Sequence, residues 1–254
     1  MLLFYVYKLV MVNFIFTKML TLRYILLTGF LLFHTFTLLA STNSDTVLVM
    51  EIRDVIDPRM NRYVELALEE ANNVGAKLVV IDMDTPGGAL NDADDISSAI
   101  LEFPLPIHVF INKDAASAGA LISIACDSIY MASGSRIGAA TVVTADGTAA
   151  PDKYQSYMRS IMRSTAEANG RDPQIAEAMV DEELEIPGIS VKGEVLTFST
   201  KEALNNGFCE AEVNDIEDIV ARQNLDDYTI YRYQKDSVEK VIAFFLNPFI
   251  SGIL

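Results

Sequence analysis

The chain has 254 residues, of which 51% are hydrophobic, 35 are acidic and 19 are basic. This length and hydrophobic content suffice for one substantial core with short appendages, so we expect one folded domain. The first 40 residues hold three of the basic residues and no acidic one, which leaves a strongly acidic remainder. Such a surface repels nucleic acid and anionic lipid headgroups, so DNA or RNA binding is disfavoured.

The first 40 residues have the layout of a secretory leader. Tyr24–Ala40 form an apolar run that follows basic residues and precedes polar ones. The run is short for a spanning helix, and Ala40 suits cleavage by signal peptidase, although Leu38 is larger than that enzyme prefers. We therefore expect residues 1–40 to be a signal peptide or an uncleaved membrane anchor. Either one places the acidic domain on the periplasmic or extracellular side.

Apolar strands alternate with amphipathic helices after residue 45. The expected strands are Thr46–Ile52, Lys77–Met83, Ile107–Ile111, Ser128–Met131, Arg136–Gly138, Glu194–Phe198 and Cys209–Val213. The expected helices run from Pro58, after the N-cap Asp57, to about Val74, and over Leu90–Phe103, Ala116–Cys126, Pro151–Asn169 and Ser199–Asn206. This alternation predicts an α/β fold with a mostly parallel sheet flanked by helices.

The two cysteines are expected to be small core residues. Cys126 falls in a predicted buried helix and Cys209 in a late strand. An exported protein could pair them, but their spacing indicates neither a disulfide framework nor a metal site.

Residues 237–254 finish the chain in an unusually apolar run. A soluble domain seldom ends on exposed apolar residues. The run is either a helix docked on the core or the start of a truncated C-terminal membrane segment, and the second interpretation leaves 41–236 as the folded domain.

Ser117 is the strongest candidate nucleophile. It lies where a strand is predicted to end and a helix to begin, so free backbone N–H groups and the helix N-terminal field point at one place. The amide of Ala118 would be one donor to an oxyanion. Gly87 or Gly88, in the turn after the neighbouring strand, would supply the other. A serine in a small-residue helix is by itself more often structural, and the Pro-Gly-Gly turn favours the catalytic interpretation.

The general base is inferred by elimination. His34 lies in the leader, and His108 lies in a predicted buried strand, where a satisfied core histidine is commoner than a base. Lys153 opens a helix after a loop rich in small residues. Lowering a lysine pKa from about 10.4 to about 7 costs roughly 4 to 5 kcal/mol, which desolvation must impose. On local sequence alone a surface lysine is the simpler interpretation. Lys113 is nearer to Ser117 but is expected to face away.

Four motifs in order resemble a known family. They are Asp82-Met-Asp-Thr-Pro-Gly-Gly88, Asp114-Ala-Ala-Ser117-Ala-Gly119, Ser135-Arg-Ile-Gly138-Ala-Ala and Pro151-Asp-Lys153. Over about residues 46–222 the chain resembles the N-terminal protease domain of NfeD-type membrane-bound serine proteases, in the superfamily of ClpP and signal peptide peptidase A. The resemblance implies a ClpP/crotonase-like fold of repeated β-β-α units with a mostly parallel sheet flanked by helices.

The resemblance also implies a function. It maps a Ser–Lys dyad onto Ser117 and Lys153, with an oxyanion hole of Gly87, Gly88 and Ala118 and no metal or cofactor. The implied substrates are hydrophobic segments of membrane-associated polypeptides, with stomatin-like proteins as partners, and the implied assembly is a homodimer or larger homo-oligomer. Here the loop before Lys153 is shorter than in the family pattern.

Two other functions remain open at this point. A crotonase-type acyl-CoA enzyme also uses paired oxyanion turns, but export and the lack of an acid at the second turn argue against it. A non-catalytic membrane scaffold could keep the fold without activity, and the presence of both Ser117 and Lys153 argues against that.

Overall fold

The computed structural model describes residues 11, 14, 16–24, 44–144, 146–225, 227–247, 250 and 252. The chain divides into two compact units, Met1–Asn43 and Ser44–Leu254. Within the first unit, residues 16–24 are helical. Most of the expected leader, including Ala40, lies outside the described residues. None of the helices described is both long and apolar enough to cross a membrane.

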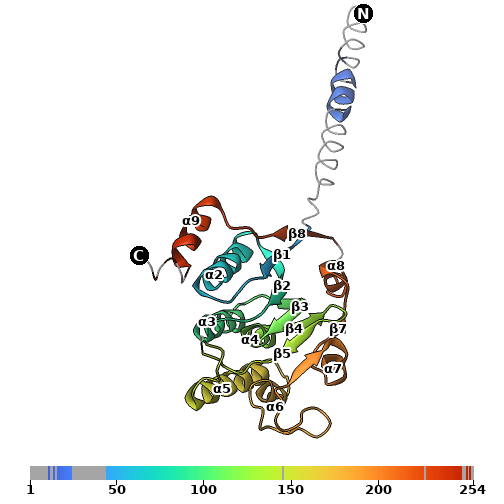
Figure 1. Ribbon diagram of the computed structural model, residues 1–254. Coiled ribbons are helices and arrows are strands. Elements are labelled where there is room, and N and C mark those ends of the chain that lie inside the picture. The colour runs from blue at the N-terminus through green and yellow to red at the C-terminus, as the bar shows by residue number, and fades with distance from the viewer. Residues whose placement is uncertain are drawn as a thin grey trace, which may run out of the picture. The chain divides into compact units, whose positions relative to one another are not determined.

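The second unit is built on an eight-stranded sheet (Figure 1). Its strands are β1 (Asp45–Ile52), β2 (Ala76–Thr85), β3 (Ile107–Ala116), β4 (Ser128–Met131), β5 (Arg136–Gly138), β6 (Thr197–Ser199), β7 (Ala211–Glu212) and β8 (Tyr228–Arg232). The order is β6-β5-β3-β2-β1-β8, with β4 joining β3 to β7. Every pairing between these strands is parallel except β5 with β6. The predicted mostly parallel α/β fold is confirmed.

The helices of this unit surround the sheet. They are α2 (Pro58–Asn73), α3 (Leu90–Leu101), α4 (Ala118–Ala125), α5 (Asp152–Ala168), α6 (Pro173–Ala178), α7 (Thr200–Asn205), α8 (Ile216–Val220) and α9 (Ser237–Leu246). The predicted start of α2 is confirmed, because Asp57 accepts hydrogen bonds from the amides of Arg59 and Met60.

Apolar residues bury both faces of the central strands. On β1, Leu48 and Met50 pack in the core that includes α2, α3 and α4, whereas Val47 and Val49 pack on the opposite face with Ile219 of α8. Each of these four β1 residues is at most 1% exposed. Continuous apolar strands of this kind belong to a sheet covered on both faces. The strand ends that carry the candidate site are therefore fixed by a rigid core.

Strand β3 changes partner along its length. It pairs with β4 over His108–Ile111 and with β5 over Asp114–Ala116, while Thr85 at the end of β2 pairs with Ala115. The strand thus continues to Ala116, well beyond the predicted end at Ile111. This extension delivers Ser117 to the edge where β2, β3 and β5 meet.

Several short elements differ from the predicted pattern. Helices α6 and α8 and strand β8 were not expected, and the expected strand Glu194–Phe198 is replaced by β6, which pairs antiparallel to β5. Segments of three to six residues carry too little periodicity to be recognised from sequence. Both cysteines are buried free thiols, as expected.

His108 lies in the core on the α8 face of the sheet, beside Tyr130 at a ring separation of 5.6 Å. Its position in the core was expected, but it is not fully satisfied, because Nδ1 has no hydrogen-bond partner in the part of the chain described. Burial lowers the pKa of His108, and the nearby Asp127 carboxylate opposes that effect. The ring is therefore held in its neutral form.

This histidine makes folding stability depend on pH. Below the ordinary histidine pKa of 6.5 the unfolded chain takes up a proton that the folded chain resists, so stability falls as pH falls. We expect His108→Phe, which keeps a ring beside Tyr130, to lose less stability than the parent between pH 7.5 and 5.5. Urea unfolding at the two pH values measures the difference. An equal loss in both proteins would show that His108 does not couple to folding.

Candidate active site

Ser117 occupies a strained turn between β3 and α4. Its φ of 54° and ψ of −115° lie outside the helical and extended regions that side-chain-bearing residues prefer. The turn is held because the Ser117 amide donates to the Gly138 carbonyl at 2.9 Å and its carbonyl accepts from the Ala120 amide at 2.9 Å. Backbone strain of this kind costs about 1–3 kcal/mol and persists where the surroundings enforce it, often at functional sites.

Gly87 passes directly over this turn. A Cβ atom on Gly87 would lie 2.7 Å from the Cβ of Ser117 and 2.9 Å from the carbonyl oxygen of Ala116. Its φ of 101° is also one that favours glycine. Position 87 therefore requires glycine for two reasons, the close approach to Ser117 and the backbone conformation.

Gly88 is braced on its other side by the loop before α2. The Ile56 amide donates to the Gly87 carbonyl at 2.9 Å, and the Ala89 amide donates to the Ile56 carbonyl at 2.8 Å. A Cβ on Gly88 would lie only 2.0 Å from the Ile56 oxygen. Sequence reasoning missed Ile56, because its role is played entirely by the backbone.

Two backbone amides are free to receive a ligand oxygen. The Gly87 amide donates to the Thr85 hydroxyl at 3.2 Å. By contrast, the amides of Gly88 and Ala118 form no hydrogen bond with any residue that the structure describes. Both residues line the same pocket as Ser117. The site therefore offers two unpaired donors beside the serine, one of them at the N-terminus of α4.

The pocket beside Ser117 has a volume of about 340 Å³. Its apolar lining includes Leu90 and Ala93 from α3, Met158 from α5 and Val142 from the loop that precedes α5. A concave apolar site with a few convergent polar groups is the usual form of a substrate pocket. None of these lining residues was singled out from the sequence, since their convergence depends on helix packing.

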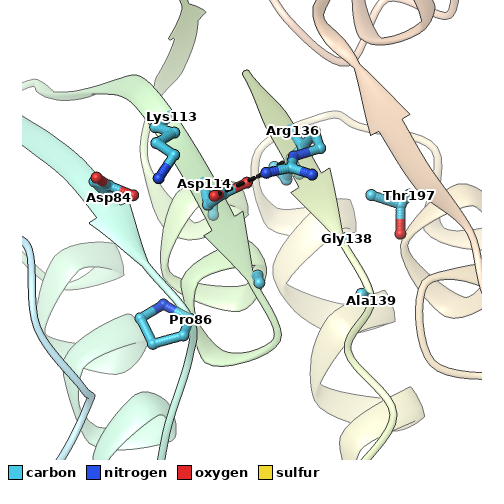
Figure 2. A pocket seen from close by; sticks show the side chains of 11 residues that line it. Asp84, Pro86, Lys113, Asp114, Arg136, Gly138, Ala139 and Thr197 are labelled. Carbon is cyan, nitrogen blue, oxygen red and sulfur yellow. Dashed lines mark hydrogen bonds and ion pairs between the residues drawn. The ribbon is translucent and has the colours of Figure 1, made fainter. Parts of the chain in front are cut away.

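A second cavity of about 580 Å³ lies along the ends of the strands (Figure 2). Asp84 and Lys113 extend into it from β2 and β3, and Arg136 on β5 forms a bidentate ion pair with Asp114 at 2.8 and 3.0 Å. Lys113 lines this cavity rather than the pocket of Ser117. The two cavities flank the serine turn. Ser117 itself lines the first, and the second is lined by Ala116, which precedes it, and by Gly138, which accepts its amide hydrogen bond.

Lys153 lies in the first turn of α5 and is exposed. Its ammonium is 4.7 Å from the ring centroid of Tyr154, and Tyr154 lines the pocket of Ser117. Lys153 itself is not among the pocket-lining residues of the described chain. The structure brings Ser117, Gly88 and Ala118 together, whereas Lys153 is exposed and is next in sequence to the pocket residue Tyr154.

No group of three or more His, Cys, Asp or Glu side chains in the described part of the chain is arranged to hold an ion. The polar groups that line the pocket are the Ser117 hydroxyl, the amides of Gly88 and Ala118, and the side chains of Asn91, Asp92 and Tyr154. Burial raises the pKa of Asp92.

A strained serine at a strand-to-helix turn, set on a mostly parallel sheet, defines a ClpP-like α/β protein. Residues 46–233 match the family described as the NfeD1b N-terminal domain. The chain belongs to that family. It is 31% identical over 216 residues to the membrane protein NfeD1b of Bacillus subtilis, covering 85% of this chain and 49% of that protein.

A second relative is the membrane-bound protease PH1510 of Pyrococcus horikoshii. It is 27% identical over 174 residues, which cover 65% of this chain and 36% of the protease. The chain therefore spans about half the length of these curated relatives, or less.

Solved structures confirm the fold. A lysine-to-alanine mutant of the 1510-N membrane-bound stomatin-specific protease, in complex with a substrate peptide, matches with a TM-score of 0.68 and 22% identity, over 81% of this chain and 99% of that one. ClpP1 from Listeria monocytogenes matches with a TM-score of 0.53 and 17% identity, over 67% and 94% of the chains.

The contact between Gly87 and Ser117 can be tested by adding one methyl group. We expect Gly87→Ala to displace the serine turn and to reduce labelling of Ser117 by a fluorophosphonate about 100-fold, since small misplacements carry such costs. Gly134→Ala is the control, because Gly134 also has a positive φ of 78° but nothing lies within 4 Å of the added Cβ. Equal labelling of the two variants, with thermal unfolding followed in parallel, would contradict the close-approach argument.

Proposed function

We propose that the chain is a serine endopeptidase in which Ser117 is the nucleophile and Lys153 the general base. The observation that carries the proposal is the strained Ser117 turn, which lines a largely apolar pocket together with two amides that have no hydrogen-bond partner in the described chain. Membership of a family with a membrane-bound protease among its relatives supports it.

The proposed reaction uses the residues in two steps. The Ser117 hydroxyl attacks the scissile carbonyl carbon while the Lys153 amine takes the hydroxyl proton. The oxyanion accepts hydrogen bonds from Gly88 and Ala118, and Gly87 shapes the turn that presents the Gly88 amide. The ammonium then protonates the departing amine, and a water activated by the same lysine hydrolyses the acyl-enzyme.

Lys153 must approach Ser117 and lose water for this chemistry. It is exposed in the present structure, and its helix begins just after the loop that borders the pocket. A peptide lying across the pocket would cover this first turn of α5, so the substrate itself would supply the desolvation that a lysine base needs. Catalytic contacts are often long in the absence of substrate.

The substrate class follows from the pocket and from the relatives. The lining of the Ser117 pocket fits an apolar side chain, so hydrophobic segments of membrane-associated polypeptides are the proposed targets. A relative of this chain is described as a stomatin-specific membrane protease, which makes a stomatin-like membrane protein the candidate partner. We propose membrane association, with the domain outside the cytoplasm, and a homo-oligomer.

The dyad is tested by single substitutions. Ser117→Ala and Lys153→Ala should each lower kcat for an apolar peptide at least about 10³-fold, as loss of a nucleophile or base does in other serine hydrolases. Lys201→Ala, an exposed lysine at the start of α7, is the matched control and should keep full activity.

Different failures have different meanings. Full activity in Lys153→Ala would remove that residue from the dyad while leaving the serine assignment intact. A parent protein that is folded, binds the peptide and never cleaves it would favour the non-catalytic scaffold.

Pocket specificity is tested through two methionines on α5. Met158 lines the Ser117 pocket, whereas Met162 is buried one turn further on and does not line it. Met158→Ala should enlarge the pocket and raise the ratio of kcat/KM for a Phe peptide over a Leu peptide about tenfold. Met162→Ala, which removes the same atoms from the core, should leave the ratio unchanged. Identical ratios in both variants would mean that substrate side chains bind elsewhere.

A further inference from the structure

Helix α9 presents an apolar stripe that the described protein leaves uncovered. Val238, Val241, Phe244 and Phe245 are each 53–64% exposed, and no residue of the helix is buried. The helix is nevertheless held in place, because Glu239 accepts two hydrogen bonds of 2.8 Å from the Arg62 guanidinium on α2. The stripe is therefore carried by a helix that this ion pair joins to α2.

A cleft of about 460 Å³ borders this stripe, between α9 and the start of α2. Phe244 belongs to both the stripe and the cleft. Val55 and Met60 add apolar lining, and Val55 is 44% exposed. The cleft is thus continuous with the apolar surface.

Cations gather in the cleft. Arg59, Lys235 and Lys240 line it, and Asp54 is the carboxylate that lines it with them. Arg59 is paired with Asp57, but neither Lys235 nor Lys240 forms an ion pair with a described carboxylate. The ammonium of Lys235 lies 4.9 Å from the ring centroid of Tyr63.

Lys235 lies among charges of both signs. Burial and the neighbouring Arg59 charge lower the pKa of Lys235, and the carboxylates of Asp57, Asp54 and Glu239 oppose that effect. Because no carboxylate in the described chain forms an ion pair with Lys235 or Lys240, their ammonium groups remain available to an added anion.

From this arrangement we infer that α9 and the cleft form a membrane-docking surface, in which Lys235 and Lys240 bind the phosphate of an anionic phospholipid while the stripe enters the acyl boundary. Interfacial helices combine an apolar face with bordering cations in this way. The ten residues of α9 rise only about 15 Å, half of a bilayer core, and this length suits a helix lying along the membrane surface.

A second copy of the chain is a poorer occupant. An isologous contact through this surface would bring the lysines of one copy close to the same lysines of the other. Cations beside apolar residues complement a phospholipid instead, and both curated relatives are membrane proteins.

The full chain can be tested with a local probe, so that any membrane contact made by residues 1–43 is the same in every sample. We would place an environment-sensitive fluorophore on Val241→Cys and, as the control, on Val191→Cys, since both valines are 57% exposed. The parent thiols, both buried, set the labelling background. With vesicles containing phosphatidylglycerol, the label at position 241 should shift to the blue and be quenched by lipid-borne nitroxide. The label at 191 should do neither.

The lysines are tested in the same format. Lys235→Gln with Lys240→Gln should weaken the lipid contact of α9 roughly 30-fold, from the usual contribution of two surface lysines. Lys192→Gln with Lys201→Gln changes the net charge equally and should have no effect. The proposal is overturned by an unresponsive 241 label, by an equal response to phosphatidylcholine vesicles, or by a blue shift without lipid that grows with protein concentration.

Discussion

The candidate site depends on one close contact, the passage of the Gly87 backbone over Ser117. Their β-carbon positions would be 2.7 Å apart, so the serine turn and the glycine turn fix each other. Each is tied to a second element, Ser117 through Gly138 and Gly87 through Ile56. Because β2 and β3 are buried on both faces, neither turn can relax by moving its strand. The strain at Ser117 is thus maintained by the whole sheet, and the amides of Gly88 and Ala118 stay free at fixed positions.

The proposed chemistry depends on the exclusion of water from Lys153 as well as on the geometry of the serine turn. The serine turn is preorganised, whereas Lys153 is exposed and does not line the pocket, so the proposed dyad would be completed only when a substrate excludes solvent. This division has a physical reason. A lysine held permanently in a dry pocket would destabilise the folded chain, while one desolvated by substrate incurs that cost only in the complex. The buried His108, the alternative base, lies on the opposite face of the sheet, in the region packed against α8, and cannot serve the same serine.

The sequence predicts the serine turn well because its signals are local. A strand, a small-residue helix and a Pro-Gly-Gly turn are readable within a few residues, and the carboxyl ends of adjacent parallel strands must meet at one edge. What sequence could not supply depends on packing between distant segments. Ile56 acts only through its backbone, Met158 reaches the pocket because α5 packs near α3 and α4, and the unpartnered Nδ1 of His108 follows from which neighbours surround that strand. The position of Lys153 depends on a loop whose path has no periodic signal.

The net charge of the sequence likewise does not predict where a local binding surface lies. A chain of formal charge −16 is expected to avoid anionic lipid, and over most orientations that expectation holds. Electrostatic interactions between exposed charges act locally, however, because dissolved salt limits their range to about 8–10 Å under physiological conditions. Lys235 and Lys240, which form no ion pair with a described carboxylate, lie beside exposed phenylalanines and can therefore attract a phosphate that the rest of the surface repels. The acidic charge on the rest of the folded domain would then disfavour its other orientations at an anionic membrane, which makes docking through the α9 surface more specific.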